Sequence, residues 1–158
     1  MTTEDTPIVP IFDSRLEAYL VVLVGCGKMG SALAYGWVDS GALDPRRLVC
    51  IDHDEKKAQA LADDLNAREA VPEVELDDEG QPVRRPRLYV IAVKPEDVKG
   101  VLEHMGEELT EEDTVISVAA GLSIAQLRRW AGPEVGIVRT MPNTPVSVRA
   151  GVTGVMGD

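Results

Sequence analysis

A glycine-rich loop between an apolar run and a helical pattern constrains this 158-residue chain more than any other feature. Residues 21–24 are consecutive aliphatic side chains, and the loop after them reads Gly25-Cys26-Gly27-Lys28-Met29-Gly30. An unbroken apolar run is typical of a strand buried on both faces of a parallel sheet, and glycines let the backbone turn tightly and approach a ligand closely. The first amides of the next helix attract anions. The spacing therefore predicts a loop that holds the pyrophosphate of a dinucleotide, with an ordinary structural turn as the alternative.

The residues that follow the second apolar run bear on which dinucleotide is bound. Asp52 stands 22 positions after Gly30, close to the spacing of ~20 for an acidic residue that binds the adenosine ribose. Its charge repels a 2′-phosphate and therefore favours NADH over NADPH. His53 occupies the place where an NADP-binding arginine would lie, and Lys56 or Lys57 remains able to reach a 2′-phosphate. The alternative role for Asp52 is to cap the following helix.

Strand and helix patterns alternate along the rest of the chain, which indicates parallel strands joined by helical crossovers. The sequence predicts an α/β fold with a doubly wound, mostly parallel Rossmann-like sheet of about six strands and helices on both faces. A flexible arm (1–19) precedes a single dinucleotide-binding domain (20–158), and an acidic solvated loop is expected over 72–87. The expected strands are 20–25, 47–52, 88–93, 114–119, 136–139 and 151–156, and the expected helices are 29–40, 54–65 with Asp54 as cap, 95–109, and one capped by Ser123.

The unusual loops all follow strands, so they gather at the carboxyl edge of the predicted sheet, where this architecture binds ligands. They are 25–30, 52–53, 94–95, 119–121 and 141–145. Because proline forces its predecessor toward extended geometry, Lys94-Pro95 is expected to shape the floor of the site rather than to donate a proton.

The composition excludes several classes of partner. The net charge of −11 disfavours nucleic acid and anionic lipid. Cys26 and Cys50 fit neither a metal-ligand spacing nor a disulfide framework, which is typical of a reducing cytoplasm. No secretory signal or membrane span is expected. No catalytic triad or metal cluster can be assembled, and hydride transfer requires neither, because the cofactor carries the chemistry.

Four segments together resemble pyrroline-5-carboxylate reductase in order and spacing, over about residues 20–157. They are the glycine loop, Ile91-Ala92-Val93-Lys94-Pro95, residues 116–121 (Ile-Ser-Val-Ala-Ala-Gly), and Val138-Arg139-Thr140-Met141-Pro142-Asn143-Thr144-Pro145 followed by Gly151-Val152-Thr153. The resemblance implies transfer of hydride from NAD(P)H to the C=N bond of 1-pyrroline-5-carboxylate, which gives L-proline. In that family NADPH is more often the coenzyme.

The resemblance also implies roles for residues at the matching positions. Residues at the pyrophosphate would be Gly25, Gly27, Lys28, Met29 and Gly30, with Asp52 and His53 near the adenosine ribose. The nicotinamide end would be shaped by Val93, Lys94, Pro95, Ala119, Ala120, Gly121 and Met141. Asn143 and Thr144 would lie at the junction of coenzyme and imine as the catalytic pair, with a rigid turn between two prolines as the alternative. No metal is implied.

The chain departs from this family in length. The family continues for roughly another hundred residues as a helical domain that forms the homo-oligomer and completes the substrate site. This chain is therefore expected to bind coenzyme but to reduce the imine poorly or not at all alone, and a monomeric state stays open for it. Two other interpretations stay open: another reductase of the same fold, such as a deazaflavin-linked NADP reductase or a hydroxyacid dehydrogenase, and a non-catalytic nucleotide-sensing module.

Overall fold

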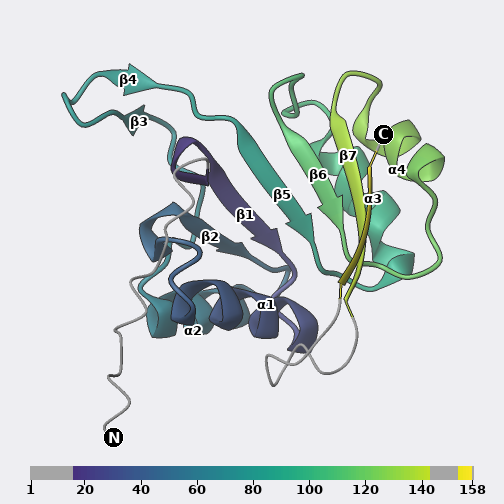
Figure 1. Cartoon of the computed structure of the whole chain (residues 1–158), viewed down its shortest axis with the longest axis horizontal. Helices are drawn as coiled ribbons and strands as arrows, with labels where there is room; N and C mark the ends of the chain where they lie inside the picture. The colour runs from purple at the N-terminus through teal and green to yellow at the C-terminus, as the bar shows by residue number, and fades with distance from the viewer. Residues whose placement is uncertain (1–15, 143–152, 158) are drawn as a thin grey trace, which may run out of the picture.

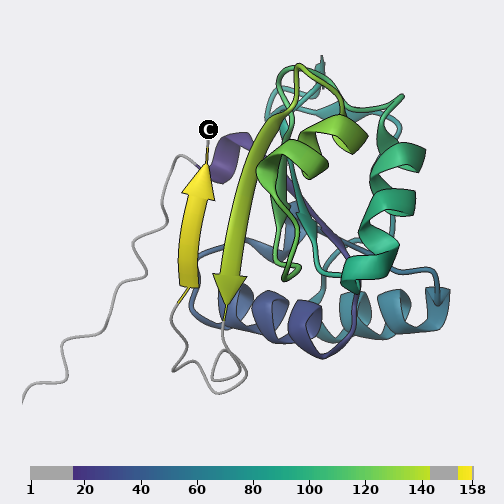
Figure 2. The same ribbon diagram turned by 90° about the vertical axis from the view of Figure 1, so that its right-hand side faces the viewer.

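The strand before the glycine loop lies inside a six-stranded sheet in the computed structural model, which describes residues 16–142 and 153–157 (Figure 1). The strand order is β2-β1-β5-β6-β7-β8. The first five run parallel, and β8 is antiparallel to β7 at the edge, where the two lie side by side in Figure 2. The strands are β1 (Leu20–Val24), β2 (Leu48–Ile51), β5 (Arg87–Ile91), β6 (Thr114–Ser117), β7 (Gly136–Pro142) and β8 (Thr153–Gly157).

Helices cover both faces of the sheet. Side chains of β1 alternate between the two faces, and every residue of this strand is buried. Leu20 and Val22 pack with α3 (Pro95–Met105) and α4 (Ile124–Ala131). Val21 and Leu23 pack with α1 (Lys28–Asp39) and α2 (Glu55–Leu65). The prediction of a doubly wound, mostly parallel sheet is therefore confirmed.

Two predicted helix caps are confirmed. The carboxylate of Asp54 accepts a hydrogen bond from the Lys56 amide at 3.2 Å and begins α2. The Ser123 hydroxyl accepts from the Gln126 amide, and the Gln126 side chain accepts from the Ser123 amide in return, which closes a capping box at α4. α3 begins at Pro95 as predicted but ends at Met105, because Gly106 follows it and glycine is a poor helix former.

The acidic segment 72–87, predicted as a solvated loop, has no buried residue but contains regular structure. It contains an antiparallel hairpin of β3 (Glu75–Leu76) and β4 (Pro82–Val83). The Asp77 carboxylate accepts hydrogen bonds from the Glu79 and Gln81 amides, at 3.0 and 2.8 Å, and Gly80 adopts a φ of +78°. Asp77 and Gly80, residue types typical of loops, thus close the turn of a hairpin.

The other correction concerns the predicted loop 141–145. Met141 and Pro142 belong to β7, where they pair with Gly154 and Thr153 of β8. Pairing of β7 with β6 stops at Arg139, so the missing amide hydrogen of proline costs no bond to β6. Residues 143–145 lie outside the described residues, as do residues 1–15 of the predicted arm. Residues 16–18 form a short 3-10 helix.

A buried carboxylate ties the hairpin to the sheet. Asp113, just before β6, is 1% exposed. One of its oxygens accepts from the Arg87 amide at 3.0 Å. The other accepts from the amide and hydroxyl of Thr110, at 2.9 and 3.1 Å, and from the guanidinium group of Arg84 at 2.9 Å. Asp113 therefore joins the start of β5, the loop before β6 and the residue that follows the hairpin.

We expect Asp113→Ala to lower the free energy of unfolding by about 3 kcal/mol or more, because it leaves several buried donors without an acceptor. Urea denaturation followed by circular dichroism measures this loss. Glu112→Ala is the matched control: Glu112 binds the same Arg84 at 3.1 Å, but its side chain is 61% exposed, so its loss should stay within about 0.5 kcal/mol. Equal, small losses in both variants would contradict a structural role for Asp113.

Candidate functional site

Two glycines of the loop are required by the way α1 packs on the sheet. Gly25 has a φ of +104°, and a Cβ atom there would lie 2.6 Å from the carbonyl oxygen of Ala92, which follows β5. A Cβ atom on Gly30 would lie 1.9 Å from the carbonyl oxygen of Gly25. Any side chain at either position would therefore force α1 away from β1 and β5.

The middle glycine is different. A Cβ atom on Gly27 would meet nothing within 4 Å, so the fold does not require glycine there. Gly27 is the N-cap of α1, which has no side-chain cap and no acidic residue in its first turn, whereas α2 and α4 are capped by their own side chains. Lys28 is exposed beside this helix end. Open space, a positive helix end and a lysine fit the pyrophosphate of a dinucleotide.

Asp52 connects the end of β2 to the glycine loop. One carboxylate oxygen accepts from the Cys26 amide at 2.7 Å, and the other accepts from the Asp54 amide at 2.9 Å. His53 Nδ1 lies 3.1 Å from the second oxygen. The Asp52 side chain is only 8% exposed, whereas that of His53 is 92% exposed. The N-cap role considered for Asp52 is filled instead by its neighbour Asp54.

The two amides decide the ionisation of Asp52. Burial raises the pKa of this carboxyl, but the hydrogen bonds from Cys26 and Asp54 outweigh burial, and the pKa lies below its ordinary value of 3.8. Asp52 is therefore a carboxylate at neutral pH. Its contribution to stability is present above that ordinary value and is lost as the pH falls through the lowered pKa of the folded state.

A crevice of about 830 Å³ lies beside this loop at the carboxyl edge of the sheet. Here the helix that follows β1 covers one face of the sheet and the helix that follows the adjacent β5 covers the other. Four predicted site residues line it: Gly25, Asp52, His53 and Val93. The sequence analysis missed the residues of its other wall, which come mainly from α3: Val71, Tyr89, Glu96, Asp97, Gly100, Val101, His104, Met105 and Glu108. The signal for the residues of α3 is their helical spacing from 97 to 108, which places them on one face of the helix and of the turn after it; Val71 and Tyr89 carried no such signal.

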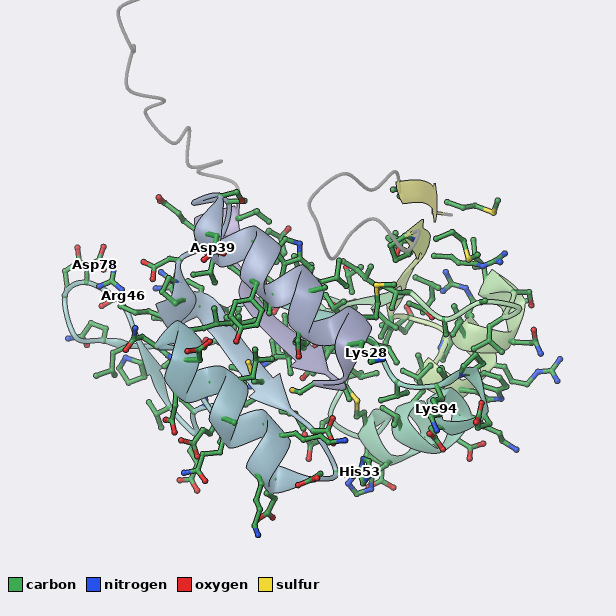
Figure 3. The ribbon with its side chains drawn as sticks, turned by 90° about the horizontal axis from the view of Figure 1, so that it is seen from below. Lys28, Asp39, Arg46, His53, Asp78 and Lys94 are labelled. Atoms are coloured by element: carbon green, nitrogen blue, oxygen red, sulfur yellow. The ribbon has the colours of Figure 1, made fainter. Side chains whose placement is uncertain are left out.

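The remaining predicted residues lie along the same edge but outside this crevice wall. Lys94 is the N-cap of α3, and Figure 3 shows it at the same edge of the molecule as Lys28 and His53. Residues 119–121 follow β6, with Ala119 buried and Gly121 at a φ of +78°. Met141 lies in β7 and is 44% exposed. The predicted catalytic pair, Asn143 and Thr144, lies outside the described residues.

The two cysteines form a buried pair. Cys26 and Cys50 belong to the core cluster shared with α1 and α2, and the Cys26 thiol donates to the Ile51 carbonyl oxygen at 3.6 Å. The neighbouring Cys50 thiol, together with burial, raises the pKa of Cys26 well above its usual range. A neutral thiol is a poor nucleophile, so Cys26 acts as a compact loop residue. Among residues 16–142 and 153–157, no cluster of three or more His, Cys, Asp or Glu side chains is suited to a metal ion.

The family comparison covers the strands and loops that form most of this edge. The model of a protein family described as "NADP oxidoreductase coenzyme F420-dependent" matches residues 20–121, from β1 to the loop after β6. The chain belongs to this family. Within the described residues, no helix has the length and apolar character needed to cross a membrane.

Named relatives narrow the resemblance. The pyrroline-5-carboxylate reductase of Escherichia coli is 36% identical over 84% of this chain and 47% of its own length. Among solved structures, the pyrroline-5-carboxylate reductase of Coxiella burnetii is 30% identical, with a TM-score of 0.74 over 88% of this chain and 49% of its own. The Plasmodium falciparum enzyme, solved with NADP bound, is 26% identical, with a TM-score of 0.62 over 87% and 47%. The resemblance to this reductase is confirmed, and the chain spans about half the length of the curated relatives it matches.

Because Gly27 is free of steric constraint, we expect Gly27→Val to separate binding from folding. The variant should fold and lose at most about 1 kcal/mol of stability, since valine is a poorer N-cap than glycine. It should nevertheless abolish binding of NADH and NADPH, because a branched side chain would occupy the space for the pyrophosphate. Intrinsic fluorescence titration measures binding, and thermal denaturation measures stability.

Gly36→Ala, on the same helix, is the control for this substitution. A Cβ atom on Gly36 also meets nothing within 4 Å, so this variant should fold and keep its coenzyme affinity. If the Gly27→Val protein binds coenzyme like wild type, the assignment of the pyrophosphate to this helix end is wrong.

Proposed function

We propose that this chain is the coenzyme-binding part of a pyrroline-5-carboxylate reductase, which transfers hydride from NAD(P)H to the C=N bond of 1-pyrroline-5-carboxylate to give L-proline. The observation that carries the proposal is the open, uncapped N-terminus of α1 at Gly27, facing the edge where the predicted site residues gather. The length of the match to the Escherichia coli pyrroline-5-carboxylate reductase supports the proposal. This match covers 84% of the 158 residues and must therefore extend past residue 121, where the match to the family model ends.

The chain's residues divide the work of binding and orientation. The first-turn amides of α1 and Lys28 hold the pyrophosphate, with Gly25, Met29 and Gly30 shaping the loop. Val93, Lys94 and Pro95 at one strand end, and Ala119, Ala120 and Gly121 at the next, confine the nicotinamide. Met141, at the end of β7, leads into Asn143 and Thr144, which we place at the imine. NAD(P)H supplies the hydride when bound.

Little acid–base chemistry is required of these residues. A protonated imine is already electrophilic, so holding the reacting carbon within ~3–3.5 Å of the hydride donor supplies much of the rate. Lys94, as N-cap of α3 before Pro95, acts through loop shape.

For the coenzyme, we propose that NADH is favoured over NADPH. Asp52 is a carboxylate at the adenosine end of the crevice, and Glu96 and Asp97 line the same crevice. A 2′-phosphate would add negative charge there. The positive charges of His53 and Lys57, which act on Asp52, would offset part of this repulsion. The relative from Plasmodium falciparum was solved with NADP bound, so the proposal of NADH rests on this chain's own acidic residues and not on the relatives.

We further propose that the working protein is a homo-oligomer in the reducing cytoplasm, formed with the helical domain that the family resemblance implies. Its partner is a small molecule, and the net charge of −11 argues against nucleic acid and anionic membranes. A domain that packs against a further helical domain would leave apolar side chains uncovered when that domain is absent. Val155 and Met156 of the edge strand β8 are 70% and 58% exposed.

One alternative has a specific observation in its favour. The description of the matching family names coenzyme F420, a deazaflavin, and its model covers residues 20–121. A deazaflavin-linked NADP reductase would use the same pyrophosphate loop but would require no imine site. A nucleotide-sensing module would bind coenzyme and turn over neither substrate.

The proposed reaction predicts oxidation of NADH in the presence of 1-pyrroline-5-carboxylate. We expect the chain alone to bind coenzyme with little turnover, and a chimera in which it replaces the matching half of the Escherichia coli relative to turn over. Absorbance at the nicotinamide band follows the reaction, and a parallel assay offers reduced F420 with NADP. A folded chimera that binds coenzyme but reduces no imine would contradict the proposal, and activity only with F420 would favour the alternative.

A separate titration checks the coenzyme. Fluorescence of NADH and NADPH in the presence of the chain should show tighter binding of NADH, by roughly tenfold for one unfavourable charge contact of about 1.4 kcal/mol. Raising the salt concentration should narrow the difference, because ions screen charges at the exposed rim. Clear preference for NADPH at low salt would overturn the assignment.

A further inference from the structure

The position of the Asp52 carboxylate bears on the loop as well as on the ribose. Both of its oxygens already accept main-chain hydrogen bonds, from Cys26 at 2.7 Å and from Asp54 at 2.9 Å. The first of these bonds joins residues 26 positions apart in the sequence, from the end of β2 to the middle of the glycine loop. A nearly buried carboxylate, 8% exposed, thus spans the two segments that flank the crevice.

Cys26 is held at every polar atom it has. Its amide donates to Asp52, its carbonyl oxygen accepts from the Ser31 hydroxyl at 3.0 Å, and its thiol lies 3.6 Å from the carbonyl oxygen of Ile51. The preceding Gly25 amide donates to the same Ile51 oxygen at 2.8 Å. The peptide units just before Gly27 are therefore fixed by β2, with Asp52 supplying the only charged contact among these bonds.

We propose that Asp52 is a positioning residue, which fixes the orientation of the phosphate-binding loop through the Cys26 amide. The proposal rests on the coenzyme binding proposed above, because the loop's amides are what the pyrophosphate meets. Amides that are oriented before the ligand arrives bind it without the entropy cost of ordering the loop. Removing the carboxylate should weaken any ligand that uses the loop, whatever it carries at its ribose.

A carboxylate suits this place because both partners are donors. Asparagine has a single acceptor oxygen, so in Asp52→Asn the side-chain NH₂ group would face one of the two main-chain N–H groups. One bond is lost and two donors are brought together. Asp54 offers the matched comparison: its substitution removes the same charge two residues away, and asparagine is as good an N-cap as aspartate.

The sign of the effect on NADPH separates positioning from ribose contact. If Asp52 acted only by repelling a 2′-phosphate, Asp52→Asn would leave NADPH binding unchanged or tighten it. If Asp52 positions the loop, NADH and NADPH both bind more weakly, by roughly tenfold for the loss of one charge-assisted bond. A change in the ratio of the two affinities then reports on the ribose end separately.

The experiment compares wild type, Asp52→Asn and Asp54→Asn as the full chain. Hydrogen exchange of the Cys26 amide is measured by NMR without coenzyme, and both coenzymes are then titrated. We expect faster Cys26 exchange and roughly tenfold weaker binding of both coenzymes in Asp52→Asn, with wild-type values in Asp54→Asn. Unchanged Cys26 exchange together with unchanged or tighter NADPH binding would overturn the proposal.

Two further measurements keep the test decisive. Asp52→Glu keeps the charge but moves the carboxylate by one methylene group, so it should show the same losses if the position of the carboxylate matters. Wild-type behaviour of Asp52→Glu would also overturn the proposal. This variant replaces Asp52→Asn in the test if Asp52→Asn fails to fold. Wild-type protein that binds neither coenzyme would refute the proposed function, while the exchange of Cys26 would still decide whether Asp52 fixes the loop.

Discussion

The arrangement of the molecule depends on the close contact between α1 and the ends of β1 and β5. Gly25 and Gly30 permit this contact, because a Cβ atom on either would overlap main-chain atoms. With α1 seated there, the carboxyl ends of the five parallel strands meet at one edge, and the N-terminus of α1 points into it. The same packing that buries β1 on both faces therefore creates a place for an anion.

The opposite edge of the sheet, at the amino ends of the parallel strands, is held together by side-chain hydrogen bonds. There the buried Asp113 collects hydrogen bonds from the segment that leads out of the β3–β4 hairpin and from the loop before β6. Asp52 and Asp113 are thus two carboxylates of low exposure that each accept hydrogen bonds from two main-chain amides, but they hold different parts of the fold. One holds a loop that a ligand must enter, and the other holds a connection that no predicted site residue uses.

Much of the fold was predictable because it depends on local patterns. Apolar runs, helical spacing and the caps Asp54 and Ser123 each act within a few residues of sequence. What could not be predicted depends on pairing between distant segments: the hairpin closed by Asp77, the extension of β7 through Pro142 against β8, and the bond from Asp52 to Cys26. For the site, spacing predicted that Asp52 binds the adenosine ribose, which stays a prediction, and only the three-dimensional structure shows that its oxygens accept from main-chain amides.

The charge distribution explains how so acidic a chain can present a site for an anionic coenzyme. Glu96 and Asp97 occupy the first turn of α3, where they offset the positive end of that helix, whereas the first turn of α1 has no acidic residue and begins with Lys28. Two helix ends therefore face one edge with different local fields. Since helix-end effects fall off within a turn and a net charge of −11 acts over the whole surface, we expect phosphates to be drawn to the N-terminus of α1 rather than to that of α3. Asp52, whose charge is already engaged by two amides, can lie beside that end without cancelling it.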